Sequence, residues 1–147
     1  MRRFPLVLAV SVFLAVPGFA QKCSEQFIRS NISSKAPDQK LVTSDSYFFS
    51  GALDKPIIGG PSTPESKKAD EKISHERKND KYEPTVERVV VAPSGDMAYA
   101  YGTEHVSYDE VPDSKHVNFT AAFLMVWRVA DGTCKIAASM YEPEGEK

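Results

Sequence analysis

The strongest constraint on the fold comes from residues 82–142, where four strand-like segments follow one another with only short turns between them. The segments are rich in β-branched and aromatic residues, and the turns PSGD, VPDSK and ADGT carry Gly, Pro and Asp-Gly signals. Parallel neighbours would need crossovers of about a dozen residues or more. The sequence therefore predicts an antiparallel meander, with strands over residues 85–92, 97–110, 116–129 and 134–141.

Side chains alternate between two faces along each predicted strand. One face of the strand 97–110 is aromatic and polar: Tyr99, Tyr101, Thr103, His105 and Ser107. The opposite face begins with three small residues: Ala98, Ala100 and Gly102. The next strand, 116–129, is apolar on both faces, which indicates a central strand covered by helix on one side and by a curved sheet or a partner chain on the other. The small residues mark a place where another element packs closely.

The chain before residue 82 carries weaker patterns. Residues 21–45 form a polar N-terminal segment, with a short helix indicated around SEQFIRSNI. The aromatic run SYFFSG and the later pair Ile57-Ile58 indicate two short strands or one bent strand. Thr63 is typical of a helix N-cap and Pro64 of the first helical position, so residues 62–81 are predicted to form a thin, mostly exposed helix or a loop.

Residues 1–20 have the layout of a secretory signal peptide. Two arginines precede an uncharged apolar stretch, and small residues stand at the minus-three and minus-one positions of a cut after Ala20. A membrane-spanning helix needs ~20 mainly apolar residues, and prolines interrupt this shorter stretch. We expect cleavage near Ala20, a secreted or periplasmic product without a stable membrane anchor, and a mature chain that starts at Gln21.

Charge and length limit what the mature chain can be. The whole chain has 18 basic and 20 acidic residues, and removal of residues 1–20 takes away two of the basic ones, leaving a net charge of −4. A protein that binds nucleic acid needs a basic stripe, and this sequence has none. The remaining residues suffice for one domain with a single core. We expect that domain over residues 46–143, followed by a tail over 144–147.

Two cysteines remain after cleavage, Cys23 near the new N-terminus and Cys134 in the last predicted strand. An oxidising compartment would allow them to pair. The chain-entropy account values a loop of that length at ~4–5 kcal/mol. The alternative is two separate thiols, one of which only fills space in the core.

The stretch from Pro84 to Glu142 resembles the SnoaL-like, DUF4440-type branch of the NTF2-like superfamily. Its segment VVVAPSGDMAYAYGT corresponds to that family's strand, Ser-Gly-Asp turn and Ala-x-x-x-Gly strand, and FLMVWRVADGTCKIAAS corresponds to its closing hairpin. SYFFSGALDKPIIGG looks like the family's early strand. The resemblance implies an α+β cone, in which a strongly bent antiparallel sheet wraps around a small number of N-terminal helices. Those helices are shortened here, so the pocket is expected to be open.

The resemblance also implies what the cone does. Our first hypothesis is a binding domain, whose cone takes up a small hydrophobic molecule or serves as the surface of a homodimer formed through the sheet. The residues assigned to this apolar site are Tyr47, Phe49, Tyr99, Tyr101, Phe123, Met125 and Trp127. A chain whose own side chains fill the cone would instead be a structural protein that binds a partner.

The alternative is an isomerase, cyclase or dehydratase of the ketosteroid-isomerase type, which uses an inward-facing acid or base. The candidate is His105, if the face it shares with Tyr99 and Tyr101 points into the cone; otherwise it is an ordinary surface residue. No metal and no cofactor is expected, because the sequence has no phosphate-binding loop, HExxH or CxxC motif. Asp109, Glu110, Asp113 and His116 gather at one turn, which we interpret as solvated.

Overall fold

The computed structural model describes residues 21–32, 38–51, 53 and 55–144. The predicted signal peptide and the last three residues of the predicted tail lie outside this range. The helical elements are α1 (Glu25–Asn31), the 3-10 turn η1 (Gln39–Leu41) and α2 (Pro64–Glu76). The strands are β1 (Val42–Ser50), β2 (Ile57–Ile58), β3 (Arg77–Val91), β4 (Met97–Glu110), β5 (His116–Ala130) and β6 (Thr133–Pro143).

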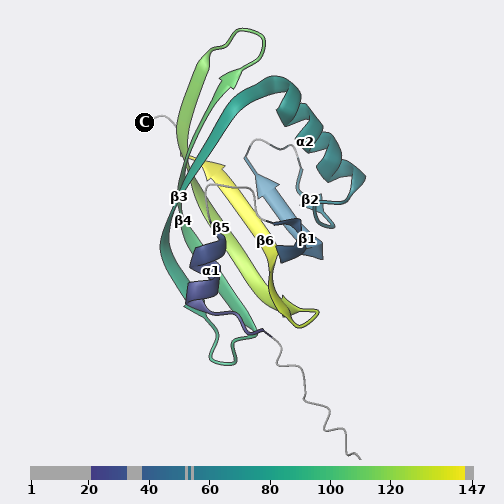
Figure 1. Ribbon diagram of the computed structural model, residues 1–147, viewed down its shortest axis with the longest axis vertical. Helices are drawn as coiled ribbons and strands as arrows, with labels where there is room; N and C mark the ends of the chain where they lie inside the picture. Colours follow the sequence, from purple (N-terminus) through teal and green to yellow (C-terminus); the bar gives the residue numbers. More distant parts are fainter. Residues whose placement is uncertain (1–20, 33–37, 52, 54, 145–147) are drawn as a thin grey trace, which may run out of the picture.

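One six-stranded sheet, in the order β2-β1-β6-β5-β4-β3, forms the body of the molecule (Figure 1). The predicted α+β class and the antiparallel meander are confirmed, because β3, β4, β5 and β6 pair as antiparallel neighbours. The sequence pattern did not show that β1 adds to β6 in parallel, with Tyr47 opposite Ala138. The last strand of the chain therefore lies inside the sheet, between β1 and β5.

The sheet is strongly bent (Figure 1), and its strand ladders contain register shifts. Register shifts interrupt the β3–β4 ladder between Lys78 and Lys81 and again between Val86 and Arg88. A third interrupts the β5–β6 ladder between Val126 and Trp127. An extra residue on one strand increases the local twist and bends that strand. The bends give the sheet a concave inner face and a convex outer face.

The inner face holds the core, under the short helix α1. Ser24 caps α1, and Ile28 is fully buried against the sheet. Phe27 packs edge-on to Trp127, with ring centroids 6.3 Å apart. Ile28 and Trp127 belong to a cluster of ten buried side chains, namely Cys23, Ile28, Val89, Ala98, Ala100, Phe123, Met125, Trp127, Cys134 and Ile136.

A disulfide joins Cys23, just before α1, to Cys134 at the start of β6. Backbone hydrogen bonds reinforce the attachment, from Gln21 N to Gly132 O over 2.7 Å and from Cys23 N to Gly95 O over 2.8 Å. A helix of seven residues is too short to be stable alone. Covalent and tertiary contacts therefore hold α1 on the inner face.

Helix α2 forms where Thr63 and Pro64 predict it, and the Thr63 side chain accepts a hydrogen bond from Ser66 N. No residue of α2 is buried. The helix connects β2 and β3, which are the two edges of the sheet. Figure 1 shows α2 on the side of β2, with the start of β3 arching across to the opposite edge. No helix in the described part of the chain is long and apolar enough to cross a membrane.

Candidate functional site

Glu104 is an acidic residue in the middle part of β4, on the side of the strand that faces the core. Ala98, Ala100, Gly102 and Val106, on the same side of the strand, are all buried. Glu104 lies opposite Ala121 of β5 and is itself only partly exposed. Within the described ranges, no hydrogen bond or ion pair involves its carboxylate. Burial raises the pKa of Glu104 above its usual value, because burial disfavours the charged form.

Two tyrosines from neighbouring strands share this part of the inner face. Tyr82 of β3 lies opposite Val106, and Tyr141 of β6 lies opposite Phe123. Burial raises the pKa of Tyr141 above its usual range, and the negative charge of Glu104 raises it further. The pKa of Tyr82 is also raised, first by burial. Both hydroxyls therefore stay protonated at neutral pH and are available as hydrogen-bond donors.

Aromatic rings lie on both sides of the cross-strand pair formed by Glu104 and Ala121. On one side Tyr141 packs against Phe123, at a centroid distance of 6.3 Å, and against Phe48, at 6.0 Å. On the other side Tyr108 packs edge-on to Phe119 at 6.5 Å. The guanidinium of Arg77 lies 4.1 Å from the centroid of the Tyr108 ring. The part of the inner face that carries the Glu104 carboxylate thus also carries tyrosine side chains and an aromatic lining.

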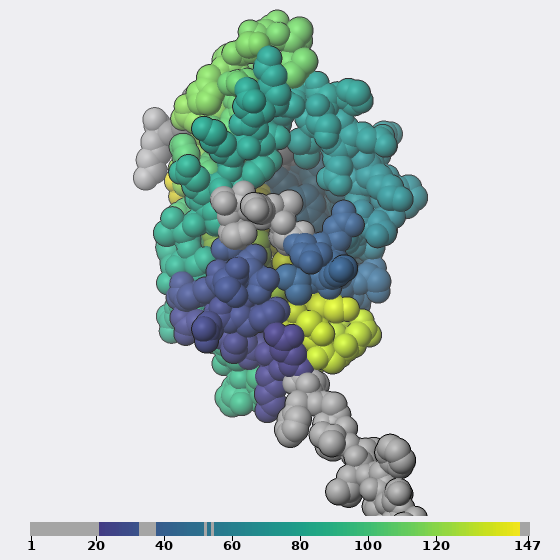
Figure 2. Space-filling model, in the orientation of Figure 1, coloured from purple at the N-terminus to yellow at the C-terminus, as the bar shows by residue number. Residues whose placement is uncertain are grey.

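Solvent reaches this part of the inner face, whereas α1 covers the other end. The inner-face residues nearest α1, Ala100 and Trp127, have no exposed surface. Glu104 and Tyr82, farther along the strands, keep partial exposure. The face that carries α1 is hollowed between α2 and β3 (Figure 2).

Comparison with known proteins identifies the architecture. No protein-family model matches the sequence, and no curated protein matches it. Solved structures do match. The dehydrochlorinase LinA-type3 from Novosphingobium barchaimii LL02, which acts on hexachlorocyclohexane, superposes with a TM-score of 0.61 at 13% identity, over 73% of this chain and 70% of that chain.

Two further structures agree. A ketosteroid isomerase-like protein from Erwinia carotovora atroseptica SCRI1043 gives a TM-score of 0.59 at 13% identity, over 73% of this chain and 78% of the other. A nuclear transport factor 2-like superfamily protein from Salmonella enterica serovar Typhimurium LT2 gives 0.53 at 11% identity, over 72% of each. The chain has the NTF2-like fold. At such low identity the similarity establishes the fold alone.

Within the NTF2-like fold, the face that we assigned to His105 points away from the cone. His105 is exposed on the outer face, and Tyr99 and Tyr101 beside it are 42% and 36% exposed. The physical reason is the packing of the small residues, since Ala98 and Ala100 lie against the core and force the alternate side chains outward. Of the two placements left open for His105, the inward one is therefore wrong and the surface one holds, and the next side chain along the strand, Glu104, lies on the inner side.

The predicted apolar site divides between the two faces. Phe123, Met125 and Trp127 lie on the inner face, but Met125 and Trp127 are core residues in the α1 half. Tyr47 and Phe49 lie on the outer face, where they border an open groove of about 380 Å³. The rest of that groove is formed by Leu124, Val126, Ala138, Ser139 and Met140.

A polar network lies on the outer face at the far end of β4. The Asp109 carboxylate accepts a hydrogen bond from Asn79 Nδ2 over 2.7 Å and lies 2.9 Å from His116 Nδ1. These contacts, that of Asn79 first, hold the pKa of Asp109 below its usual value. They border an open polar depression of about 460 Å³. No group of three or more metal-ligating side chains occurs within the residues the structure describes.

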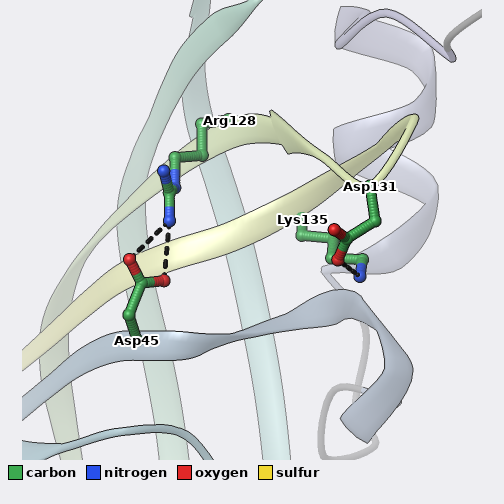
Figure 3. A network of polar contacts seen from close by, with 4 residues as sticks. All are labelled: Asp45, Arg128, Asp131 and Lys135. Carbon is green, nitrogen blue, oxygen red and sulfur yellow. Dashed lines mark hydrogen bonds and ion pairs between the residues drawn. The ribbon is translucent and has the colours of Figure 1, made fainter.

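Two ion pairs fix the outer surface near the β5–β6 turn (Figure 3). Arg128 Nη2 donates to both carboxylate oxygens of Asp45, each over 2.6 Å, and so links β5 to β1. Lys135 donates to Asp131 over 2.9 Å, beside the turn. Both pairs are part of the scaffold and lie away from Glu104.

Sequence reasoning missed Glu104 because it assigned the aromatic side of β4 to the cone. The small side chains were the better signal. The run Ala98, Ala100 and Gly102 already indicated close packing, and strand alternation then puts Glu104 on the packed side. Tyr82 lies before the predicted strand 85–92 and Tyr141 at the end of the strand 134–141, so alternation within those strands did not identify either as an inner-face residue.

Proposed function

We propose that the inner face binds a small, largely apolar molecule, and that Glu104 is the charged group that meets it. The observation that carries this proposal is the unpaired carboxylate of Glu104 within an aromatic lining. Ligand sites are mostly apolar, with a few placed polar groups that fix orientation. A purely structural sheet has no reason to keep an unpaired carboxylate there, because its burial costs free energy.

Backbone amide NMR can test the location of binding. Small aromatic probes such as 2-phenylethanol and tryptophol should shift the amide resonances of Ala121, Phe123 and Tyr141. The amides of Ser94 and Gly132, in the β3–β4 and β5–β6 turns, serve as internal controls. Shifts confined to those turns, or no shifts at millimolar probe concentrations, would refute binding on the inner face.

A second candidate function is proton transfer, of the isomerase, cyclase or dehydratase type. It is favoured by the raised pKa of Glu104 and by the protonated hydroxyls of Tyr82 and Tyr141. Glu104 would accept a proton from a carbon next to a carbonyl group, and a tyrosine would donate a hydrogen bond to the oxygen that becomes negative. Return of the proton to another carbon gives isomerisation, and loss of a leaving group gives elimination. A ketosteroid isomerase-like protein and a dehydrochlorinase are among the structural neighbours.

Ring opening of 5-nitrobenzisoxazole tests this second candidate without knowledge of the natural substrate. A carboxylate base removes the C–H proton while the N–O bond breaks, and the phenolate product absorbs visible light. The wild type should accelerate the reaction, and Glu104→Gln should abolish the acceleration. Glu83→Gln removes an exposed carboxylate on β3 and is the matched control. Equal rates for the wild type and both variants would exclude Glu104 as a base.

We also propose that the protein is a SnoaL-like member of this fold and that it works after export. The closing-hairpin motif around FLMVWRVADGTCKIAAS supports the first point. The Cys23–Cys134 disulfide supports the second, because disulfides persist mainly in oxidising compartments. N-terminal sequencing of the mature protein tests export directly, with Gln21 as the expected first residue.

A further inference from the structure

The carboxylate of Glu104 lacks a positive partner. The ion pairs of the described residues engage Glu25, Asp45, Glu76, Asp109 and Asp131, and none engages Glu104. Arg77 is the cation recorded against this lining, and it lies over the Tyr108 ring. A carboxylate that loses water without gaining a cation is destabilised. A ligand that supplied the missing positive charge would remove that penalty.

The strand register surrounds this carboxylate with aromatic rings. On one side of the Glu104–Ala121 pair, Gly102, Phe123 and Tyr141 lie side by side across three strands. On the other side, Val106 lies between Tyr82 and Phe119. The faces of aromatic rings carry negative potential and attract cations. The carboxylate and the rings therefore favour the same kind of ligand.

Arg77 supplies an independent indication that this lining accepts a cation. Its guanidinium lies 4.1 Å from the Tyr108 ring centroid, and Tyr108 contacts Phe119 on the same inner face. One cation of the protein itself thus packs against a ring of this lining. Glu104 offers in addition a full negative charge.

We propose that the natural ligand is a cation: an apolar molecule that carries a protonated amine or a quaternary ammonium group, with the charge placed against Glu104 between the two aromatic rows. The inference rests on the proposed binding function and narrows it to one chemical class. Ligands with a carboxylate or phosphate at that position are disfavoured, because they would bring like charge to Glu104.

Matched pairs of amines and alcohols test the charge without a known ligand. The probes are 2-phenylethylamine with 2-phenylethanol, tryptamine with tryptophol, and octylamine with octan-1-ol, titrated into the full mature protein by calorimetry at pH 7. Each amine should bind about tenfold or more tightly than its alcohol, which corresponds to about 1.4 kcal/mol. Glu104→Gln should reduce the preference to less than about threefold. Glu83→Gln removes the same charge from an exposed position on the neighbouring strand and should leave the preference unchanged.

The outcomes separate this inference from the function on which it rests. If each amine and its alcohol bind with equal affinity, and the probes still shift inner-face NMR resonances, the preference for a cationic ligand is refuted but binding on the inner face is not. A preference that survives Glu104→Gln would also overturn the inference, because the charge would then be recognised elsewhere. Absence of binding by every probe would overturn both. The circular dichroism spectrum of Glu104→Gln should match that of the wild type, which excludes misfolding as the cause of any loss.

Discussion

Glu104 occupies a position where its neighbours on the same side of β4 are small or apolar and buried. Its carboxylate is partly desolvated and unpaired, so the folded state holds it at a cost. Functional sites often carry such costs, which the rest of the structure offsets. The contrast with His105, the next residue along, shows how strand alternation separates a candidate for chemistry from an ordinary surface side chain.

The raised pKa of Glu104 predicts how stability changes with pH. Because the folded state binds the proton more tightly than the unfolded state, stability falls as pH rises from the ordinary glutamate pKa through the folded value. Glu104→Gln removes this penalty, so its urea midpoint should exceed that of the wild type at pH 7. The difference should shrink as pH is lowered toward 4. A variant less stable than the wild type at pH 7 would contradict the assigned environment.

A second prediction concerns the cost of adding a side chain at Gly102. A Cβ atom there would lie 2.0 Å from Thr85 O, in the β3 backbone next to the register shift. Backbone atoms give way only with strain, so Gly102→Ala should cost about 2–3 kcal/mol or more, measured by urea unfolding. Gly132→Ala is the control. Gly132 has a φ of 73° but no atom within 4 Å of its Cβ position, so it should cost about 1–2 kcal/mol.

Because Gly60 lies in a loop, the sequence predicts that Gly102→Val destabilises the protein far more than Gly60→Val. The structure makes that difference smaller, because Gly60 is itself constrained. Gly60 has a φ of 77°, and a Cβ atom would lie 2.8 Å from Thr43 O. Sequence patterns identify a loop but not the close approach of another strand to it.

At the scale of elements, the helix α1 depends for its stability mainly on contacts with the rest of the protein. Seven residues and one buried isoleucine remain on the helical side of the cone, and the attachment at Cys23 compensates for the missing length. The sequence predicted a shortened helical side. It favoured pairing of the two cysteines over two separate thiols, and the structure contains that bridge.

Loss of the disulfide should therefore affect α1 first. Its two cysteines are 111 residues apart in the sequence, and a loop of that length corresponds to about 4–5 kcal/mol in the chain-entropy account. The double variant Cys23→Ala/Cys134→Ala should lose much of this stability and show rapid hydrogen exchange at Ile28. The wild-type protein treated with a reductant should show the same loss of stability and the same rapid exchange at Ile28 as the double variant. Slow exchange at Ile28 in the double variant would mean that packing alone holds the helix.

At the scale of the whole molecule, the outer face presents an apolar band across four adjacent strands. Five large side chains on it are 36–50% exposed, namely Tyr47, Met97, Tyr99, Tyr101 and Met140. In the strand order β1-β6-β5-β4, aromatic residues lie at both ends and aliphatic residues between them. A two-fold axis along the strands would place Tyr47 and Phe49 of one copy over Tyr99 and Tyr101 of the other. We propose a second copy of the chain as the partner.

Light scattering after size-exclusion chromatography tests this dimer. Met140→Lys places a charge in the middle of the band and should shift the mass from that of two chains to that of one. Ile73→Lys is the control, because Ile73 is similarly exposed but lies on α2. A stable interface covers about 800 Å² per partner, so one buried charge should be decisive. A wild type that elutes with the mass of one chain would refute the proposal.

More of the fold than of the candidate site could be predicted from the sequence. Turn signals and alternation specify the meander, because its contacts are between neighbours in the chain. The pairing of β1 with β6 is non-local, and the choice of inner face depends on what packs against it. Glu104 could be identified only once that choice was known.

The position of β6 has a consequence for the order in which the protein can be completed. Residues 133–143 are made after everything they hold together, yet they are the strand on which β1 adds and the origin of the second sulfur. A ribosome delivers the chain from its N-terminus. Until these residues emerge, β1 has no neighbour for its parallel edge and Cys23 has no partner. The sheet therefore cannot be completed, nor the disulfide formed, before β6 has been made.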